Sequence, residues 1–384
     1  MLALGVAACD GGATGGPALV PGGPGGVPPA GFCAGTGPII DLGAVLTPGS
    51  GDCDRDSFAA ALCSCTDLDV KGYLAVSSRD PMLSTAGSVG ANGDMQLFGY
   101  ADVGGSVRVA GAAPLGFYGY LRTGAQLEVG GSVAVKDSGF AAGYLEVGGD
   151  AKVAGDIALL GYATIAGDLT QPAGALTPVV LDVAGARLTG AVDVAPPCAC
   201  GESQIPDLAG LVADARTHND DPAIGLAPGA LRDVVGVAGV TLPCGHYYLD
   251  EISGKGLIYI KATGRVALHI GGDVEPTGLF VIEVTPGAEV DLVIGGSLRS
   301  TGALGFGALD RPGSLRAYVA GGGDVRLTGA SGFAGNLYAP RAAIVGTGAT
   351  FVNGSLFGRA IEIPGFLQVS YDPTVRGDCG IEVN

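Results

Sequence analysis

Acid/base chemistry in this sequence would have to come from one short polar run, because histidine is scarce. The chain has 3 His among 384 residues, and only His218 is followed closely by acidic residues, Asp220 and Asp221. An imidazole beside a carboxylate is a common general acid/base arrangement. The same run directly follows a stretch with helical periodicity, so a polar helix end explains it more simply. We therefore expect no catalytic residue and no enzyme activity.

Sulfur offers a second kind of chemistry. The sequence contains 9 Cys, and apart from Cys9 near the N-terminus an even number remains. An even set is typical of a disulfide framework in an exported, oxidising compartment. These cysteines lie outside the glycine repeats, so we expect disulfides at caps and crossovers, in a connectivity that the sequence leaves open. The disulfide candidates are Cys33, Cys53, Cys63, Cys65, Cys198, Cys200, Cys244 and Cys379.

Zinc binding is the alternative use for some of these cysteines. Cys63-Ser-Cys65 and Cys198-Ala-Cys200 form two close pairs, and paired cysteines are common zinc ligands. Their C-x-C spacing is shorter than the usual C-x2–4-C, and histidine is scarce. We therefore expect no metal and no other cofactor.

The N-terminal segment resembles a bacterial lipoprotein signal. Residues 2–9 read LALGVAAC, and Val6-Ala7-Ala8-Cys9 is similar to the lipobox, in which the cysteine is lipidated and becomes the first mature residue. Small residues before Cys9 suit a signal peptidase, although no basic residue precedes the apolar run. The resemblance implies lipidation of Cys9 and attachment to a membrane through that lipid.

A six-residue repeat predicts the elements that hold these residues. From Gly143 the chain reads GYLEVG, GDAKVA, GDIALL, GYATIA, GDLTQP. Positions six apart cannot share one face of an α-helix at 3.6 residues per turn, whereas a short strand followed by a regular bend repeats in this way. We predict an all-β fold, a three-sided parallel β-helix with three hexads per coil. Two apolar columns should point inward, one with Val147, Val153, Leu159 and Ile165, the other with Leu145, Ala151, Ile157, Ala163 and Leu169.

Glycine followed by aspartate marks the corners of the predicted β-helix. Glycine tolerates positive φ and close backbone approach, and an aspartate after it accepts a backbone N–H in an Asx turn. Calcium binding is the alternative, but the calcium-binding repeat G-G-x-G-x-D-x-U-x is absent. The turn-forming candidates are Gly149, Asp150, Gly155, Asp156, Gly167 and Asp168.

Breaks in the repeat divide the chain. The hexads stop at a Pro/Cys segment, and Leu208, Leu211, Val212 and Ala215 then follow the i, i+3, i+4, i+7 pattern of a short amphipathic helix. The later strands are longer and less regular, forming one solenoid with looser rungs or a second one stacked on the first. The predicted segments are a lipoprotein signal remnant at 1–9, a Gly/Pro-rich tether at 10–37, a Cys-containing N-terminal cap at 38–92, the hexad β-helix at 93–194, a Cys/Pro crossover with the helix at 195–250, a looser β-helix section at 251–375 and a C-terminal tail at 376–384.

Charge excludes several classes of partner. The formal net charge is −17, which argues against nucleic-acid binding through phosphate contacts and against attraction to anionic lipid. Mean hydropathy is +0.43, yet the sequence has no uninterrupted apolar run of about 18 residues. A scattered acidic surface keeps a long solenoid soluble; weak binding of divalent cations is the alternative.

Two stretches resemble known bacterial proteins. Steps such as Val153-Ala154-Gly155-Asp156-Ile157, over about 93–172, resemble bactofilins, which are polymer-forming β-helix proteins. Over about 198–373, the CAC, the short helix, HND, LPCGHYYLD and the stretch NLYAPRAAIVGTGATFVNGSLFGRAIEIPGFLQVSYD are similar to an uncharacterised bacterial surface domain of exported lipoproteins and pilus-associated proteins. These resemblances imply a right-handed β-helix and an exported, non-enzymatic role.

The leading functional hypothesis is a cell-envelope lipoprotein whose rigid β-helix serves surface structure or adhesion, with a surface polysaccharide or a protein as partner. The alternatives are a self-assembling, bactofilin-like filament former and a polysaccharide-active β-helix enzyme. Tyr100, Tyr120, Tyr144 and Tyr162 each follow a corner glycine. They form either an exposed aromatic stripe or a stack that supports the corners.

Overall fold

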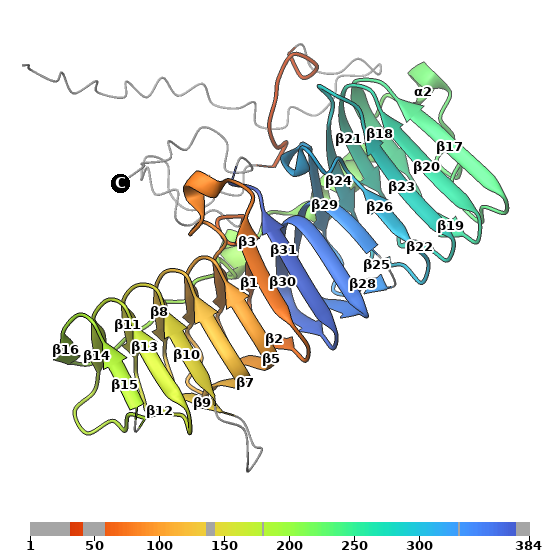
Figure 1. Ribbon diagram of the computed structural model, residues 1–384. Coiled ribbons are helices and arrows are strands. Elements are labelled where there is room, and N and C mark those ends of the chain that lie inside the picture. Colours follow the sequence, from red (N-terminus) through yellow and green to blue (C-terminus); the bar gives the residue numbers. More distant parts are fainter. Residues whose placement is uncertain (1–30, 41–57, 136–142, 179, 329–330, 374–384) are drawn as a thin grey trace, which may run out of the picture.

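A single β-solenoid accounts for the part of the chain that the structure describes. The computed structural model describes residues 31–40, 58–135, 143–178, 180–328 and 331–373. Parallel strands stack in about 13 coils and join into one sheet (Figure 1). The all-β, parallel β-helix prediction is therefore confirmed, and both predicted apolar columns are buried inside it. Cys9, Cys53 and Cys379 lie outside the described residues.

The coils of the solenoid contribute strands to three faces, which we name A, B and C; in the two coils at the β16 end the described strands belong to faces A and C only. Strand β10 (Tyr144–Val147) lies on face C, β11 (Ala151–Val153) on face A and β12 (Ile157–Ala158) on face B. In the next coil Ala163 lies beside Leu145 and Ile165 beside Val147. Since side chains alternate along a strand, the apolar members point inward and the residue between them points outward.

Face A runs along the whole solenoid. In stacking order it contains β18 (Gly245–Leu249), β21 (Arg265–Ile270), β24 (Glu289–Ile294), β27 (Leu315–Val319), the middle of β29 (Ser331–Thr347) and of β30 (Ala349–Ile363), β1 (Leu62–Ser64), β4 (Val89–Ala91), β6 (Val107–Val109), β8 (Leu127–Val129), β11, β14 (Leu169–Gln171) and β16 (Arg187–Thr189).

The other two faces are built in the same way. Face B contains β19 (Ile252–Gly254), β22 (Val274–Pro276), β25 (Leu298–Arg299), β28 (Val325–Thr328), the ends of β29 and β30, β2 (Leu68–Val70), the beginnings of β5 (Met95–Val103) and β7 (Leu115–Thr123), β9 (Val133–Val135) and β12. Face C contains β17 (Val237–Leu242), β20 (Leu257–Ala262), β23 (Leu279–Val284), β26 (Leu304–Phe306), the beginnings of β29 and β30, β31 (Phe366–Tyr371), β3 (Leu74–Ser78), the ends of β5 and β7, β10, β13 (Tyr162–Ile165) and β15 (Val180–Val183).

The order of the coils in space differs from their order in the chain. The first strands, β1–β3, lie in the middle of the solenoid, and the following coils lead to one end at β16 (Figure 1). Residues 190–236 then cross to the opposite end, where β17 begins, and the remaining coils lead back to the middle. The stretch at 251–375 is thus part of the same continuous solenoid rather than a second one.

One coil near the middle is assembled from both ends of the described chain. Strand β31 supplies face C of this coil, while β1 and β2 supply faces A and B against β30. Strand β31 also pairs with β3 on its other side. The Tyr371 hydroxyl donates a hydrogen bond of 2.7 Å to the Phe58 carbonyl across the break. The prediction that 38–92 forms a cap is therefore wrong for β1–β3, because coils of the second half stack on them.

Helix α1 (Leu208–Ala215), the crossover and residues 31–40 cover the outside of face A from β18 to β4. Helix α1 is the predicted amphipathic helix; the Asp207 carboxylate caps it by accepting the Gly210 N–H at 2.8 Å. Its buried side chains pack on outward-facing residues of face A such as Val293 and Tyr318. The other helical segments are α2 (Asp221–Ile224) and three 3-10 turns, Pro81–Leu83, Glu202–Gln204 and Pro312–Ser314. Among the described residues, no helix combines the length and apolar character that crossing a bilayer requires.

Close stacking of the coils predicts that Gly307→Ala is far more destabilising than Gly348→Ala. Both glycines have positive φ, 76° and 82°, so either alanine adds backbone strain of roughly 1–2 kcal/mol. Only at Gly307 would the new Cβ overlap a neighbouring carbonyl, that of Ala334; at Gly348 it meets open space. We expect the Gly307→Ala cost to exceed about 3 kcal/mol, measured as the free energy of unfolding in urea. Equal costs for the two variants would contradict this account.

Candidate functional site

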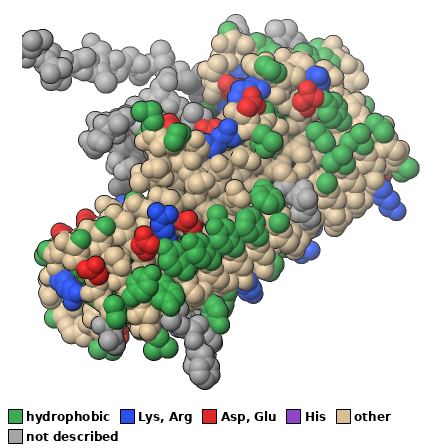
Figure 2. Space-filling view, viewed as in Figure 1, with side chains coloured by type: hydrophobic (Ala, Val, Ile, Leu, Met, Phe, Trp, Pro, Cys, Tyr) green, Lys and Arg blue, Asp and Glu red, His purple; other side chains and the backbone are tan. Residues whose placement is uncertain are grey.

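Face C carries exposed large hydrophobic side chains along the length of the solenoid. Face A, by contrast, is covered from β18 to β4 by α1, the crossover and residues 31–40, and beyond β4 it exposes charged side chains such as Arg108 and Lys152. Figure 2 shows hydrophobic side chains gathered in a band that runs along the solenoid. Contiguous exposed apolar surface of this kind marks interaction sites, so face C is the best candidate for a functional surface.

An aromatic ladder forms the centre of this surface. We use this name for the residues that occupy one register position of successive face-C strands: Phe366, Tyr73, Tyr100, Tyr120, Tyr144 and Tyr162. Ring centroids are 5.2 Å apart for Phe366 and Tyr73, 5.3 Å for Tyr73 and Tyr100, and 4.7 Å for Tyr100 and Tyr120, with nearly parallel planes. Tyr144 and Tyr162 are 4.8 Å apart and inclined by 52°. The sequence left two alternatives for the tyrosines, an exposed stripe or a stack that supports the corners. In the structure these residues stack on one another and Tyr100, Tyr144 and Tyr162 are also exposed.

A row of charged residues runs beside the ladder, two positions further along each strand. Asp102, Arg122 and Glu146 are neighbours in successive coils. Arg122 lies 3.4 Å from Asp102 and 3.7 Å from Glu146. The Tyr120 hydroxyl donates a hydrogen bond to Glu146, and burial together with this bond raises the pKa of Tyr120. The ladder hydroxyl therefore remains protonated at physiological pH.

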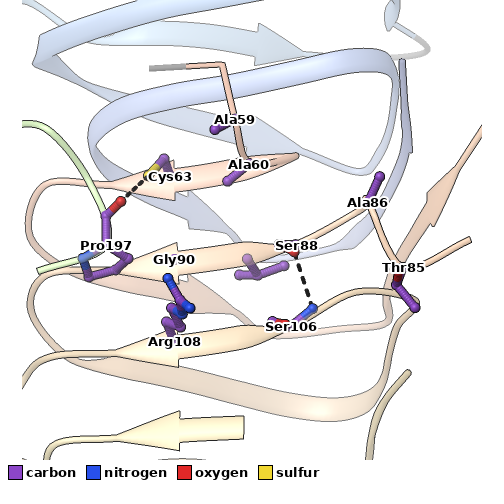
Figure 3. A pocket seen from close by; sticks show the side chains of 11 residues that line it. Ala59, Ala60, Cys63, Thr85, Ala86, Ser88, Gly90, Ser106, Arg108 and Pro197 are labelled. Carbon is purple, nitrogen blue, oxygen red and sulfur yellow. Dashed lines mark hydrogen bonds between the residues drawn. The ribbon is translucent and has the colours of Figure 1, made fainter. Parts of the chain in front are cut away.

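A small hollow on face A is a second place where a ligand could bind (Figure 3). Its volume is about 260 Å³, and Pro197 of the crossover forms one wall. The polar groups in it are already paired: Ser88 Oγ accepts the Ser106 N–H at 3.2 Å, and Arg108 lies 3.0 Å from Glu128. The hollow thus offers little unpaired chemistry to a ligand.

Three disulfides lie in the described part of the chain. Cys63–Cys198 and Cys65–Cys200 fasten the crossover to β1 and the residue after it, and Cys33–Cys244 fastens the N-terminal segment to the turn between β17 and β18. The two C-x-C pairs therefore bond to each other instead of forming a zinc site. Crossover staples were expected, but Cys63 lies within a strand of a central coil, where the sequence analysis placed no cysteine.

The polar run at 218–221 does not converge on one site. His218 Nδ1 lies 2.9 Å from Asp214 Oδ1 at the exposed end of α1. Asp220 accepts the His246 N–H at 2.8 Å, and Asp221 accepts the Tyr248 N–H at 3.1 Å. The two carboxylates thus accept backbone N–H groups of β18, a strand of the terminal coil, and hold the start of the solenoid in place.

The corner aspartates bond between coils rather than within a turn. Asp150 accepts the N–H of Asp168 at 2.8 Å, Asp168 accepts that of Ala186 at 2.7 Å, and Asp156 accepts that of Leu176 at 2.8 Å. The local Asx turn predicted from the sequence is therefore replaced by a ladder of side-chain bonds along the solenoid. A single hexad carries no signal for this, because the donor belongs to the next coil.

A buried charge network anchors residues 31–40, and no pattern in the sequence predicts it. Arg316 donates to Asp291 at 2.7 and 2.9 Å, to Glu289 at 2.8 Å and to the Gly37 carbonyl at 3.1 Å. Arg265 donates to the Gly37 carbonyl at 2.9 Å. Burying a guanidinium is costly unless its donors are all engaged. Asp291 and Arg316 are outward-facing neighbours in adjacent coils, and that pairing depends on the strand register.

Three groups near the β18 end have shifted pKa values, one raised and two lowered. Burial raises the pKa of Asp221 to about 6, while the hydrogen bond from the Tyr248 N–H opposes this. Burial lowers the pKa of His269 to about 4, and it also lowers the pKa of His246. In the folded protein Asp221 takes up a proton readily and both histidines resist doing so.

These shifts predict that Asp221→Asn makes the protein more sensitive to acid. Asp221 has a raised folded pKa, so it stabilises the fold as the pH falls from 7 towards 4. His269 acts oppositely, because its folded pKa is lowered. The stability that the neutral, buried imidazole contributes is complete above pH 6.5 and is lost as the pH falls towards 4. Between pH 7 and 5 the variant should lose about 1.4 kcal/mol more than the wild type, measured by urea unfolding. His269→Gln should show the opposite change, and identical pH dependence of all three proteins would contradict the assignment.

Comparison with known proteins yields one match. Residues 203–377 match the family model described as "Domain of unknown function (DUF7305)". The match begins just before α1 and includes β17–β31, so it covers the end of the crossover and every coil from the β17 end to the composite coil. The coils from β4 to β16, which carry Tyr100 to Tyr162, lie outside it. No curated protein and no solved structure matches the chain.

Proposed function

We propose that this protein is a non-enzymatic scaffold of the bacterial cell envelope, held at a membrane by a lipid on Cys9, and that face C of its solenoid contacts partners. The observation that carries the proposal is the difference between the faces. From β18 to β4, face A is buried under α1, the crossover and residues 31–40, and its remaining coils expose charged side chains such as Arg108 and Lys152, whereas face C presents an exposed aromatic ladder. A long, regular surface of this kind suits contact with an extended partner better than it suits catalysis.

The covalent staples support an exported location. Disulfides persist in oxidising compartments and are rare in the cytosol, and the described residues hold three of them. Two of these lie side by side and fix the crossover to β1. They would keep the crossover in place against β1.

The contacts of residues 31–40 support a load-bearing role for the N-terminal segment. Cys33–Cys244 and the bonds from Arg265 and Arg316 hold this segment against face A. Tension on a lipid anchor at Cys9 would therefore reach the solenoid at the β17–β18 turn before it reached β1 and the composite coil. This arrangement protects the coil that has a break in the chain.

The anchor predicts that Cys9→Ser releases the protein from the membrane. In a bacterial host, the wild type should fractionate with membranes and carry a diacylglyceryl mass on Cys9, because the thiol is the site of attachment. The Cys9→Ser variant should lose that mass and leave the membrane fraction, while Cys53→Ser serves as a cysteine control that stays membrane-bound. An unlipidated, cytosolic protein with reduced cysteines would overturn the proposal.

Filament formation is a second candidate function, and the ends of the solenoid favour it. Among the described strands, β17 pairs only with β20, and β15 only with β13. Val237 on β17 is 77% exposed and Val180 on β15 is 58% exposed. Open edge strands template further pairing. The edge strands β17 and β15 both belong to face C and run in the same direction. Strand β17 of one copy could therefore pair in parallel with β15 of a second copy, as β31 pairs with β3 within the chain.

End-to-end addition predicts that Val237→Lys abolishes filaments. A lysine at the open edge would place a charge against the apolar edge of the next copy, whereas Leu279→Lys places the same charge two coils further in. Electron microscopy of the purified protein should show filaments for the wild type and for Leu279→Lys, and separate particles for Val237→Lys. Separate particles for the wild type would exclude this second function.

A further inference from the structure

We infer that the aromatic ladder and the charged row beside it form a binding track for a linear, uncharged polysaccharide. This inference rests on the proposed function and names the partner of face C. The hydrophobic core does not require the ladder, since its rings lie on the outside of the sheet. Tyr100 and Tyr162 are each 43% exposed and Tyr144 is 37% exposed.

The composition of the track fits sugar chemistry. Tyrosine combines an apolar ring with a polar hydroxyl, and Asp102, Arg122 and Glu146 line the ladder with hydrogen-bond donors and acceptors. A pyranose has the same combination, with apolar C–H groups on its faces and hydroxyls at its rim. A purely apolar partner would leave the charged row without contacts.

The geometry of the track requires a linear ligand. The ladder has one ring per coil, at a strand spacing of about 4.8 Å, and it is straight because the coils stack in register. From Phe366 to Tyr120 the rings cover each other's faces, so a ligand meets ring edges and hydroxyls there. Tyr144 and Tyr162 are inclined to each other by 52°, so their ring faces do not fully cover each other and can stack on a sugar.

Charge selects an uncharged polymer over an acidic one. In the row beside the ladder, Arg122 is paired with two carboxylates, those of Asp102 and Glu146, so the row is negative as a whole. The chain also carries a net charge of −17. An acidic polysaccharide would be repelled by both, whereas a neutral chain meets no such repulsion.

Affinity electrophoresis of the full-length protein with its disulfides intact tests the inference. Gels would contain hydroxyethyl cellulose or glycol chitin as neutral polymers, or alginate as an acidic one. The neutral polymers should retard the wild type and alginate should not.

Replacing both Tyr144 and Tyr162 with Ala should weaken binding about tenfold, since two ring contacts are lost. Tyr118→Ala removes a tyrosine that is 40% exposed on the neighbouring corner, and it should bind as the wild type does.

Several outcomes would overturn the inference. They are retardation by alginate alone, no retardation by either neutral polymer, and unchanged affinity after both ladder tyrosines are removed. Urea unfolding of each variant shows whether a loss of binding comes from a loss of fold. If neither neutral polymer retards a protein that is lipidated and membrane-bound, the polysaccharide partner is rejected and the envelope scaffold is retained. If a neutral polymer retards a protein that proves to be cytosolic, the envelope scaffold is rejected and the polysaccharide partner is retained.

Discussion

In-register stacking of parallel coils is the constraint on which the rest of this structure depends. Every described strand pairs with a strand in an adjacent coil, and each inward-facing residue lies over its counterpart. A shift by one residue would turn the apolar columns outward. Corners must therefore repeat closely, which is why Gly307 lies against the Ala334 carbonyl and why Asp150 bonds to the Asp168 N–H of the next coil. The same register places Tyr100 beside Tyr120 and Arg122 beside Glu146.

Stacking without chain continuity explains the unusual path of the chain. A coil recognises its neighbour through backbone hydrogen bonds and a shared core, and neither requires a covalent connection between them. Strand β31 therefore pairs in parallel with β3 and with β30, five residues on each side, although β3 lies far from it in the chain. The cost is a crossover from one end of the solenoid to the other. That crossover covers face A, and two disulfides fix it to the central coils, so that the connection itself adds to the fold.

This division of the surface gives the proposed function its physical basis. Because α1, the crossover and residues 31–40 cover face A from β18 to β4, only faces B and C are open along the whole length of the solenoid. Face C carries the exposed rings. Its regularity suits a partner that is itself extended and repetitive. The open edges at β15 and β17 offer a different kind of contact, because they present unpaired backbone instead of side chains.

The sequence by itself determined the local structure of this protein. The hexads with Leu145 and Val147 inward and glycine at the corners predict strands, faces and coils, because alternation and bending depend on residues close together in the chain. The helix at 208–215 and the disulfide chemistry follow in the same way. Only the tertiary structure decided that β1–β3 lie in the middle, that Cys63 pairs with Cys198, and that Asp291 and Arg316 meet beneath residues 31–40. The physical reason is that all coils offer similar edges to one another. A repeat specifies how a coil stacks, and the long-range contacts decide which coil it stacks on.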